Sequence, residues 1–432
     1  MKFLHISDLH IGKRVNEFSM IEDQKHILRQ ILGIAEREQA EAVLIAGDIY
    51  DKPVPSAEAV QIFDSFLTEL ADRGKSVFVV SGNHDSPERI AFGAQLMSGR
   101  GVHMSPVYGG DVTGIPLADE YGEIFIYLLP FVKPATVRHA LERPVGTESR
   151  QGISASGGMS DSGTGQEALV SDDMSEPETG QDISASESLS EPESRQGIPL
   201  PDSYQDAVKA AVGLMEIAPE KRNILVAHQF VTGAGRCDSE DVAVGGLDNV
   251  DAEVFDAFDY VALGHIHSPQ SVRRESVRYC GTPLKYSFSE AEQVKSVTIL
   301  EMREKGNMEI STVPLTPLRD MRKIRGTYLE VTARSFYQDF DREDYVQVTL
   351  TDEEDIPDGL QKLRIIYPNL MRLSYDNRRT RQENSIEAAE AVERKSELEL
   401  FGEFYELQNN QSMSGEQAAF VKQVIEQMRG EA

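Results

Sequence analysis

The feature that most constrains this sequence is a regular alternation, over residues 1–130, of short apolar runs with segments of helical periodicity. The runs "KFLHIS", "AEAVLIAGD" and "KSVFVV" are typical of buried strands. Between them, the apolar residues of 20–39 and 56–74 recur at the spacing of an amphipathic helix. Units of strand, helix and strand build a largely parallel sheet covered by helices. The sequence therefore predicts an α/β fold.

Five apolar runs end in residues that can bind a metal ion. These residues are Asp8, His10, Asp48, Asn83, His228, His265 and His267. Ligands of open α/β sheets sit at the carboxyl ends of the strands, so we expect the seven donors to converge on one rim. The set contains no thiolate and suits Mn²⁺, Fe²⁺ or Zn²⁺. Seven donors are too many for one open site, but sharing one carboxylate gives two sites of four donors each.

Composition narrows the class of protein. The 432 residues carry a net charge of −29, which argues against coating nucleic acid by bulk electrostatics but not against a local site. Only two cysteines are present, Cys237 and Cys280, as suits a reducing cytosol, and we expect a cytoplasmic protein. We expect no signal peptide and no membrane span, because "MKFLHISDLHIG" has no basic segment before a long apolar core and no run approaches roughly 20 apolar residues.

The pattern changes along the chain. Residues 144–202 hold 12 acidic residues and two arginines within a cryptic 15-residue repeat, which predicts a disordered acidic insertion. Strands resume after it, and residues 327–375 indicate a small α+β unit with strands at "TYLEVT", "DYVQVTL" and "LMRLSY". We expect a main α/β domain at 1–318, a capping domain at 319–376 and a helical tail at 377–432.

The strand ends resemble a known family. "SDLHIG", "GDIYD", "SGNHDSP", "VAHQF" and "LGHIHSP" are similar to the five ordered motifs of the calcineurin-like metallophosphoesterases. "GGLDNVDAEVFDAFDYVALGHIHSPQ" and "CGTPLKYSFSE" further resemble the bacterial SbcD family, the nuclease subunit of the SbcC–SbcD complex. The resemblance covers nearly the whole chain except 144–202, and it implies a four-layer α/β/β/α sandwich with a cap and a tail.

The resemblance also implies how the donors are shared. One cation would be held by Asp8, His10, Asp48 and His267. The other would be held by Asp48, Asn83, His228 and His265. A carboxylate common to both suits two dications that repel each other, and such a pair activates water for attack on phosphorus.

Three further residues follow the same strands. His84 has no ligand role in this scheme and should point at the phosphate, as a transition-state stabiliser or general acid worth about 10²–10⁴-fold in rate. Asp51 and Asp85 can orient ligand histidines, or can equally be local turn residues.

Later parts of the chain suggest partners. The basic cluster Arg319, Arg322, Lys323 and Arg325 is either a solvated surface or a contact to the DNA backbone. The tail places Leu398, Phe401, Phe404, Tyr405, Phe420 and Val424 on amphipathic helices. These helices either fold back onto the cap or bind a partner's coiled coil.

The resemblance implies a Mn²⁺-dependent DNA nuclease with 3′-to-5′ exonuclease activity on duplex ends and endonuclease activity on hairpins. It would act with an SbcC-type ATPase in DNA repair, recombination and replication, as a homodimer within a heterotetramer. The alternatives are a stand-alone phosphatase on the same scaffold and an inactive scaffold subunit. The sequence leaves open the cellular metal, the cleavage polarity, the dimer interface and the role of the insertion.

Overall fold

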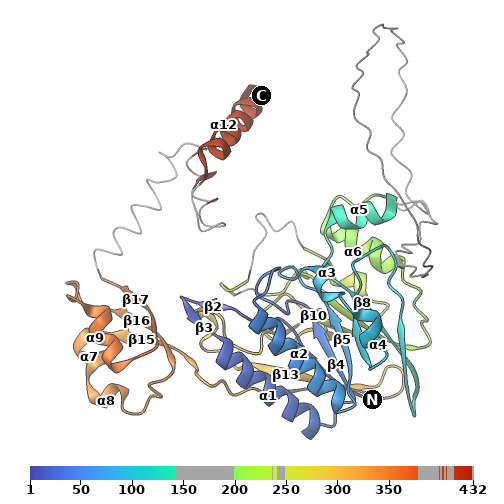
Figure 1. The fold of residues 1–432 in the computed structure, drawn as a ribbon, viewed down its shortest axis with the longest axis horizontal. Coiled ribbons are helices and arrows are strands. Elements are labelled where there is room, and N and C mark those ends of the chain that lie inside the picture. Colours follow the sequence, from blue (N-terminus) through green and yellow to red (C-terminus); the bar gives the residue numbers. More distant parts are fainter. Residues whose placement is uncertain are drawn as a thin grey trace, which may run out of the picture.

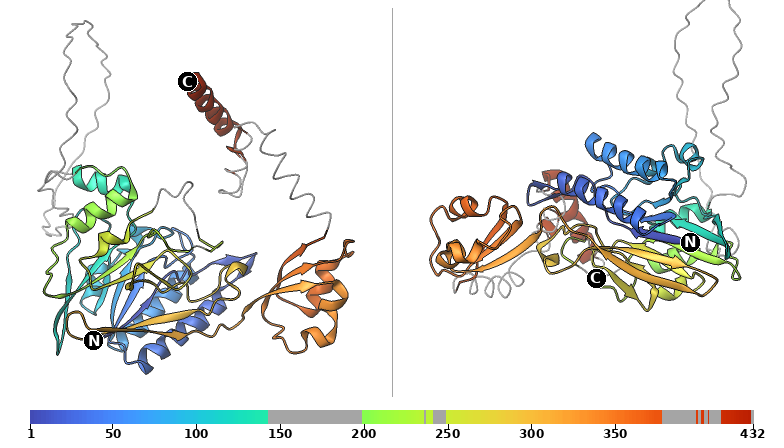
Figure 2. Two further views of the ribbon diagram at one scale, coloured as in Figure 1. Left: turned by 180° about the vertical axis from the view of Figure 1, so that it is seen from behind. Right: turned by 90° about the horizontal axis from the view of Figure 1, so that it is seen from below.

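Two six-stranded sheets pack face to face between two layers of helices (Figures 1 and 2). This computed structural model describes residues 1–142, 199–235, 237–240, 249–377, 398, 401–402, 405 and 413–430. The expected α/β/β/α sandwich with a small α+β unit is confirmed.

The first sheet has parallel strands at its centre. In spatial order its strands are β14 (Met308–Pro314), β13 (Ser296–Met302), β1 (Lys2–Ile6), β4 (Ala42–Ala46), β5 (Ser76–Val80) and β6 (Val102–Met104). Helices α1 (Ile21–Arg37) and α2 (Ala57–Asp72) cover its outer face. Alternate residues of each strand face opposite sides, so Leu4 packs among the helices and Phe3 packs against the second sheet.

The second sheet is built in the same way. Its strands are β11 (Gln270–Val272), β12 (Arg274–Tyr279), β10 (Tyr260–Gly264), β9 (Arg222–His228), β8 (Gly122–Leu129) and β7 (Ile115–Asp119). Helices α5 (Pro134–Glu142), α6 (Tyr204–Gly213) and η3 (Ala252–Phe255) cover its outer face. Short elements complete the domain: β2 (Arg14–Val15), β3 (Phe18–Ser19), α3 (Pro87–Ile90), α4 (Ala94–Ser98) and η4 (Phe288–Glu290).

The two sheets approach each other closely at the carboxyl ends of β4, β9 and β10. A Cβ added at Gly264 would lie 1.8 Å from the carbonyl oxygen of Ala46, so only glycine fits there. His228 Nδ1 bridges the sheets by donating to the same carbonyl oxygen at 2.9 Å. The ends of β1, β4, β5, β9 and β10 therefore open onto one rim.

The small α+β unit corrects one sequence prediction. It is a parallel sheet of β15 (Met321–Gly326), β16 (Tyr345–Leu350) and β17 (Leu370–Tyr375), with helices α7 (Tyr328–Thr332), α8 (Arg334–Tyr337) and α9 (Gly359–Ile366). "TYLEVT" was expected to be a strand but forms α7, because Thr327 and Glu330 make a capping box that starts a helix. The third strand is instead the basic segment of β15.

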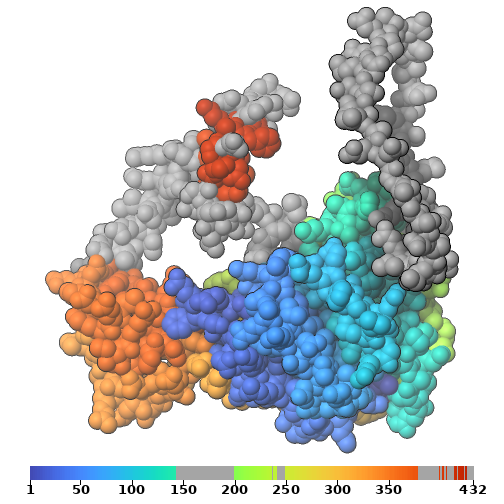
Figure 3. Space-filling view, in the orientation of Figure 1, coloured from blue at the N-terminus to red at the C-terminus, as the bar shows by residue number. Residues whose placement is uncertain are grey.

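This unit lies beside the main body and is tied to it (Figure 3). Asp23 on α1 is buried, and its carboxylate accepts from Arg319 at 2.7 Å and from the Tyr345 hydroxyl at 2.8 Å. Met321 and Met371 extend into the hydrophobic cluster under α1. The boundary expected near residue 319 stays a prediction.

Two regions fall partly outside the described residues. Of the expected insertion, only residues 199–202 are described, and Pro201 there is buried. In the tail, α12 (Gly415–Gly430) is helical, as expected for the segment that carries Phe420 and Val424. At its start Ser414 N–H donates to Gln417 Oε1 and Gln417 N–H donates to Ser414 Oγ. Among the described residues no helix has the length and apolar character needed to cross a membrane.

A buried ion pair closes the second sheet at its far end. The Arg222 side chain is 2% exposed and that of Asp119 is 11% exposed, and two hydrogen bonds of 2.5 and 3.1 Å join them. Burial acts to raise the pKa of Asp119, but hydrogen bonds led by the Arg222 guanidinium hold that pKa well below its usual range.

Asp119→Asn should lower the free energy of unfolding by about 3 kcal/mol, because it leaves a buried guanidinium without its counter-ion. The loss should be largest at neutral pH. The native pair stabilises the protein above the unfolded carboxyl pKa of about 3.9 and loses this effect as the pH falls through the lower folded pKa. Urea unfolding at several pH values measures it. The exposed pair Glu123–Lys221 is the control, since Glu123→Gln should cost less than about 1 kcal/mol. Equal losses in the two variants would contradict the assignment.

Candidate metal centre

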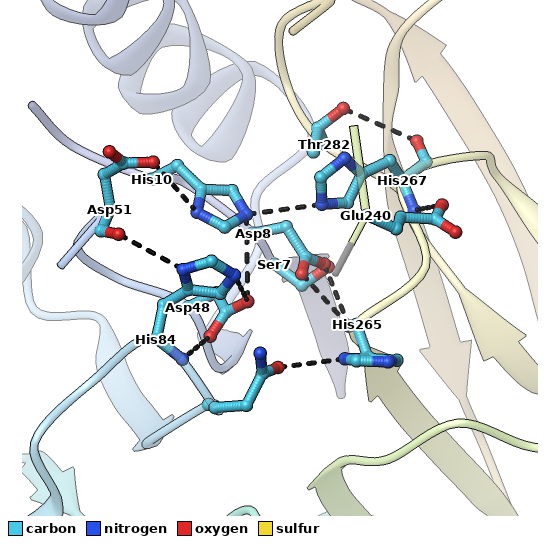
Figure 4. Close-up of polar contacts among 12 residues, drawn as sticks. Ser7, Asp8, His10, Asp48, Asp51, His84, Glu240, His265, His267 and Thr282 are labelled. Atoms are coloured by element: carbon cyan, nitrogen blue, oxygen red, sulfur yellow. Dashed lines mark hydrogen bonds and ion pairs between the residues drawn. The ribbon is translucent and has the colours of Figure 1, made fainter. Parts of the chain in front are cut away.

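The rim between the two sheets gathers all seven donors predicted from the sequence. Six of them are buried, with exposed fractions of 7% or less: Asp8, His10, Asp48, His228, His265 and His267. Three groups place their ligand atoms within 4.8 Å of one another. They are Asp8 with His10 and His267, His10 with Asp48 and His84, and Asp8 with Asp48 and His228. Figure 4 shows the side chains of Asp8, His10, Asp48 and His267 turned toward a common centre.

The backbone at these strand ends is strained. Asp8, His10 and Asp48 have φ angles of 53°, 44° and 50°, and His265 has 101°. Non-glycine residues rarely adopt positive φ, at a cost of about 1–3 kcal/mol each. Hydrogen bonds hold the turns in place, since Asp8 N donates to Gly47 O and His10 N donates to Asp48 O, both at 3.0 Å. These strained conformations lower the stability of the fold, and they direct the four side chains toward the centre.

On one side of the centre lie Asp8, His10, Asp48 and His267. The Nε2 atoms of His10 and His267 are 3.3 Å apart, and His10 Nε2 is 3.7 Å from Asp48 Oδ2. Asp8 is fixed by Ser7, whose hydroxyl donates to Oδ2, and by the backbone N–H of His265, 3.0 Å from Oδ1. The four side chains expected to share one cation are therefore together.

On the other side lie Asn83, His228 and His265, again beside Asp48. Asn83 Oδ1 is 2.9 Å from both His228 Nε2 and His265 Nδ1. His228 Nε2 is also 3.4 Å from Asp48 Oδ2, so the carboxylate of Asp48 lies between the two groups. Because His228 Nδ1 donates to a carbonyl oxygen, Nε2 is the ring nitrogen that faces the centre and is available to a cation. The arrangement matches the second expected set.

The two carboxylates of the centre differ in their electrostatics. Burial raises the pKa of Asp8 to about 7. Burial acts the same way on Asp48, but His228, His10 and His84 hold its pKa well below the usual range. Burial alone would lower the pKa of His228, whereas the neighbouring Asp48 raises it to about 9. Asp48 is therefore the stronger anion of the two.

The residues fit divalent cations. Among the described residues, neither Asp8 nor Asp48 forms an ion pair with a lysine or an arginine, although both are buried. Buried charges are normally paired or bound to a metal. Carboxylate, amide and imidazole donors suit Mn²⁺, Fe²⁺ or Zn²⁺. A bound cation would offset the negative charge that no lysine or arginine of the described residues compensates.

His84 sits at the mouth of the centre. Its side chain is 19% exposed, more than the buried ligand candidates, and its Nε2 is 3.9 Å from Asp48 Oδ2. Its Nδ1 lies 3.1 Å from the carbonyl oxygen of Asp51, to which it donates. His84 is also close enough to His10 and Asp48 to act as a ligand. Geometry alone leaves both roles open.

Asp51 and Asp85 both support the centre, but in different ways. Asp51 holds His84 through its carbonyl oxygen, and its carboxylate binds Lys13 at 2.7 Å and lies 3.9 Å from His10 Nδ1. Asp85 accepts three backbone N–H groups, from Ile49, Tyr50 and Gly82, at 2.9–3.0 Å. Asp51 thus fits the expected contact with histidines better than Asp85, which fixes the loops instead.

The basic cluster and the tail do not reach the centre in any contact among the described residues. Arg319, Arg322 and Arg325 each pair with an aspartate, and Lys323 is exposed on β15. In the tail, Phe401, Phe420 and Val424 are 41%, 67% and 37% exposed. Leu398 and Tyr405 are half-buried, and Phe404 lies outside the described residues. The roles expected for both groups stay predictions.

Two supporting residues escaped the sequence analysis. Gln24 on α1 donates to the carbonyl oxygen of His10 at 2.7 Å, and Glu240 accepts from the backbone N–H of His267 at 2.7 Å. Gln24 follows no donor motif, because it serves the site from a helix rather than a strand end. Glu240 lies 27 residues before its partner, and no pattern links the two.

Comparison with known proteins agrees with this geometry. The model of the calcineurin-like phosphoesterase family matches residues 1–269, and that of the type 5 capsule protein repressor C-terminal domain matches residues 317–409. The chain is 27% identical, over 98% of both chains, to a Staphylococcus epidermidis protein named as the D component of the nuclease SbcCD. The resemblance stated from the sequence is thereby confirmed.

Solved structures also match 72–73% of the chain. A dimetal phosphatase from Danio rerio is 13% identical, with a TM-score of 0.38 over 73% of this chain and 98% of that one. The protein TT1561 of Thermus thermophilus is 14% identical, with a TM-score of 0.35 over 72% of this chain and 98% of that one.

Asp48→Ala should abolish binding of both cations, because Asp48 Oδ2 lies between the two donor groups, 3.7 Å from His10 Nε2 and 3.4 Å from His228 Nε2. Equilibrium dialysis with Mn²⁺, followed by elemental analysis, should find two ions in the wild type and none held tightly in the variant. Circular dichroism should stay unchanged. Replacing the exposed Asp64 by alanine is the matched control. Retention of one tightly bound ion by Asp48→Ala would show that the carboxylate is not shared.

Proposed function

The chain belongs to the calcineurin-like phosphoesterase family, and on that premise we propose that it is the Mn²⁺-dependent nuclease subunit of a DNA-processing complex. The observation that carries the proposal is the convergence of seven donors and His84 at the strand ends, within the segment matched by the family model. The nuclease named for the relative, similar over 98% of both chains, supports DNA as the substrate rather than a small phosphate ester. A complete donor set argues against an inactive scaffold.

In this proposal Asp8, His10, Asp48 and His267 hold one cation, and Asp48, Asn83, His228 and His265 hold the other. Two divalent cations bound there would activate water and neutralise charge on the phosphate. The protein's contribution is to keep these donors fixed before substrate arrives. The hydrogen bonds of Ser7 to Asp8 and of His228 to Ala46 do this directly.

His84 is proposed as the residue that donates a proton or a hydrogen bond to the phosphate or to the leaving oxygen. Its Nδ1–H is donated to Asp51, so Nε2 is the atom available for proton transfer at the mouth of the site. A protonated Nε2 can donate to a phosphate oxygen or to the departing sugar oxygen. Such a role needs partial exposure, which His84 has and the buried donors lack.

His84→Ala should separate metal binding from chemistry. Because His84 is assigned no cation, the variant should still bind two Mn²⁺ ions, while cleavage should slow by about 10²–10⁴-fold. Metal analysis and single-turnover cleavage of an oligonucleotide measure the two effects. If the variant bound only one ion, and its slower cleavage followed from that missing ion, His84 would instead be a metal ligand.

The substrate class is tested by a direct comparison. With Mn²⁺, the protein should open a DNA hairpin and degrade duplex ends in the 3′-to-5′ direction, and it should hydrolyse a simple phosphate monoester far more slowly. Asp48→Ala provides the blank for contaminating nuclease. Faster turnover of the monoester than of DNA would favour a stand-alone phosphatase.

The partner is proposed to be a coiled-coil ATPase of the SbcC type, with the nuclease as a homodimer in the cytoplasm. The exposed Phe420 and Val424 of α12, one helical turn apart, support a helix that binds a partner's apolar groove. Phe420→Asp with Val424→Asp should abolish co-purification with the ATPase and leave Mn²⁺-dependent cleavage by the isolated subunit intact. Replacing the exposed Lys422 of the same helix by alanine is the control. Full affinity in the double variant would place docking elsewhere.

A further inference from the structure

Behind His267, on the side away from His10, lies a buried polar network to which the proposed centre gives no role. It joins Ser239, in the loop after β9, to Glu290 and Lys295 from the segment before β13. Glu290 is fully buried and Lys295 is 4% exposed. Glu290 is the last residue of "CGTPLKYSFSE". This segment resembles the SbcD family, but the resemblance gives no role to any of its residues.

Ser239 links the carboxylate of Glu290 to the imidazole of His267. Its hydroxyl oxygen is 2.6 Å from Glu290 Oε1 and 2.7 Å from His267 Nδ1. A carboxylate can only accept, so the Ser239 hydroxyl donates its proton to Glu290. The hydroxyl oxygen then accepts from His267, which requires the proton of the neutral ring to be on Nδ1. His267 Nε2 is left with its lone pair, facing His10 Nε2 at 3.3 Å.

Glu290 is itself held in place. Its Oε2 accepts from Lys295 Nζ at 2.5 Å and from the Thr282 hydroxyl at 3.4 Å, and its Oε1 also accepts from the backbone N–H of Tyr286. Lys295 pairs with the negative charge of Glu290, which stays fixed as an acceptor. Glu290, the last acceptor in the hydrogen-bond chain that runs from His267 through Ser239, is therefore held in one position.

Lys295 and a second carboxylate, Glu240, also hold the backbone of His267 in place. Lys295 Nζ donates to the carbonyl oxygen of His267 at 2.9 Å. The backbone N–H of His267 donates to Glu240 Oε1 at 2.7 Å. Figure 4 shows Glu240 and Thr282 around His267. Ring and main chain are therefore fixed together, with the free nitrogen toward the centre.

We propose that Ser239 and Glu290 are positioning residues for His267. The Glu290 carboxylate, acting through the Ser239 hydroxyl, keeps the proton on Nδ1 and keeps Nε2 turned toward a divalent cation. This inference rests on the proposed role of His267 in the metal centre. Outer hydrogen bonds of this kind fix the tautomer of metal-binding histidines, and their loss typically weakens the site about 10- to 100-fold.

The test is Mn²⁺ binding by the full chain, measured by calorimetric titration and by the electron paramagnetic resonance of bound Mn²⁺. Ser239→Ala should weaken one of two sites by about 10- to 100-fold and leave the other near its wild-type affinity. Ser239→Thr keeps the hydroxyl and should restore tight binding. Ser289→Ala is the matched control, because Ser289 contacts the backbone N–H of Asp238 in the same loop and has no hydrogen bond to His267 among the described contacts.

Thermal unfolding of the metal-free proteins separates positioning from simple packing. We expect Ser239→Ala to unfold near the wild-type temperature without Mn²⁺ and to gain less stability than the wild type when Mn²⁺ is added. Two wild-type sites in Ser239→Ala would overturn the inference, as would a lower unfolding temperature without any change in affinity. If the wild type itself bound no cation, the proposed centre would fail, and the inference with it.

Discussion

Two carboxylates buried between two sheets, Asp8 and Asp48, are the constraint on which the rest of the structure depends. Among the described residues no lysine or arginine pairs with either carboxylate. Their partners are histidines, the Ser7 hydroxyl and backbone N–H groups. Such an arrangement is unfavourable in a protein without cations and favourable once divalent ions bind. Left-handed backbone at Asp8 and Asp48 adds to this cost. The fold offsets it with two large apolar cores and a tightly packed interface between the sheets.

The surrounding structure explains how this centre stays rigid. The close approach at Gly264 and the bond from His228 to Ala46 lock the two sheets together beside the donors. Asp85 ties the loops after β4 and β5 by three backbone hydrogen bonds. The network of Ser239 and Glu290 supports the remaining side through His267. Each support reaches the ligands from a different element, so the geometry does not depend on a single loop.

The sequence predicted the donors because each follows an apolar run, and parallel strands bring such ends together. It failed where contacts set the outcome. "TYLEVT" has strand composition, but the capping box of Thr327 and Glu330 makes it a helix. The strand β15 was not identified from the sequence, because its basic residues interrupt the apolar pattern. Ser239 and Glu290 were missed because they lie 51 residues apart and meet only through the fold. Resemblance marked the segment of Glu290, but only the structure indicates what that carboxylate contacts.

The central claim is that one carboxylate, Asp48, joins two cation sites built from both sheets. Anomalous scattering from crystals grown with Mn²⁺ tests it most directly, because it locates each ion independently of activity. The account predicts two peaks, both in contact with Asp48, one beside His10 and His267 and the other beside His228 and His265. A single peak, or two peaks of which only one touches Asp48, would contradict it.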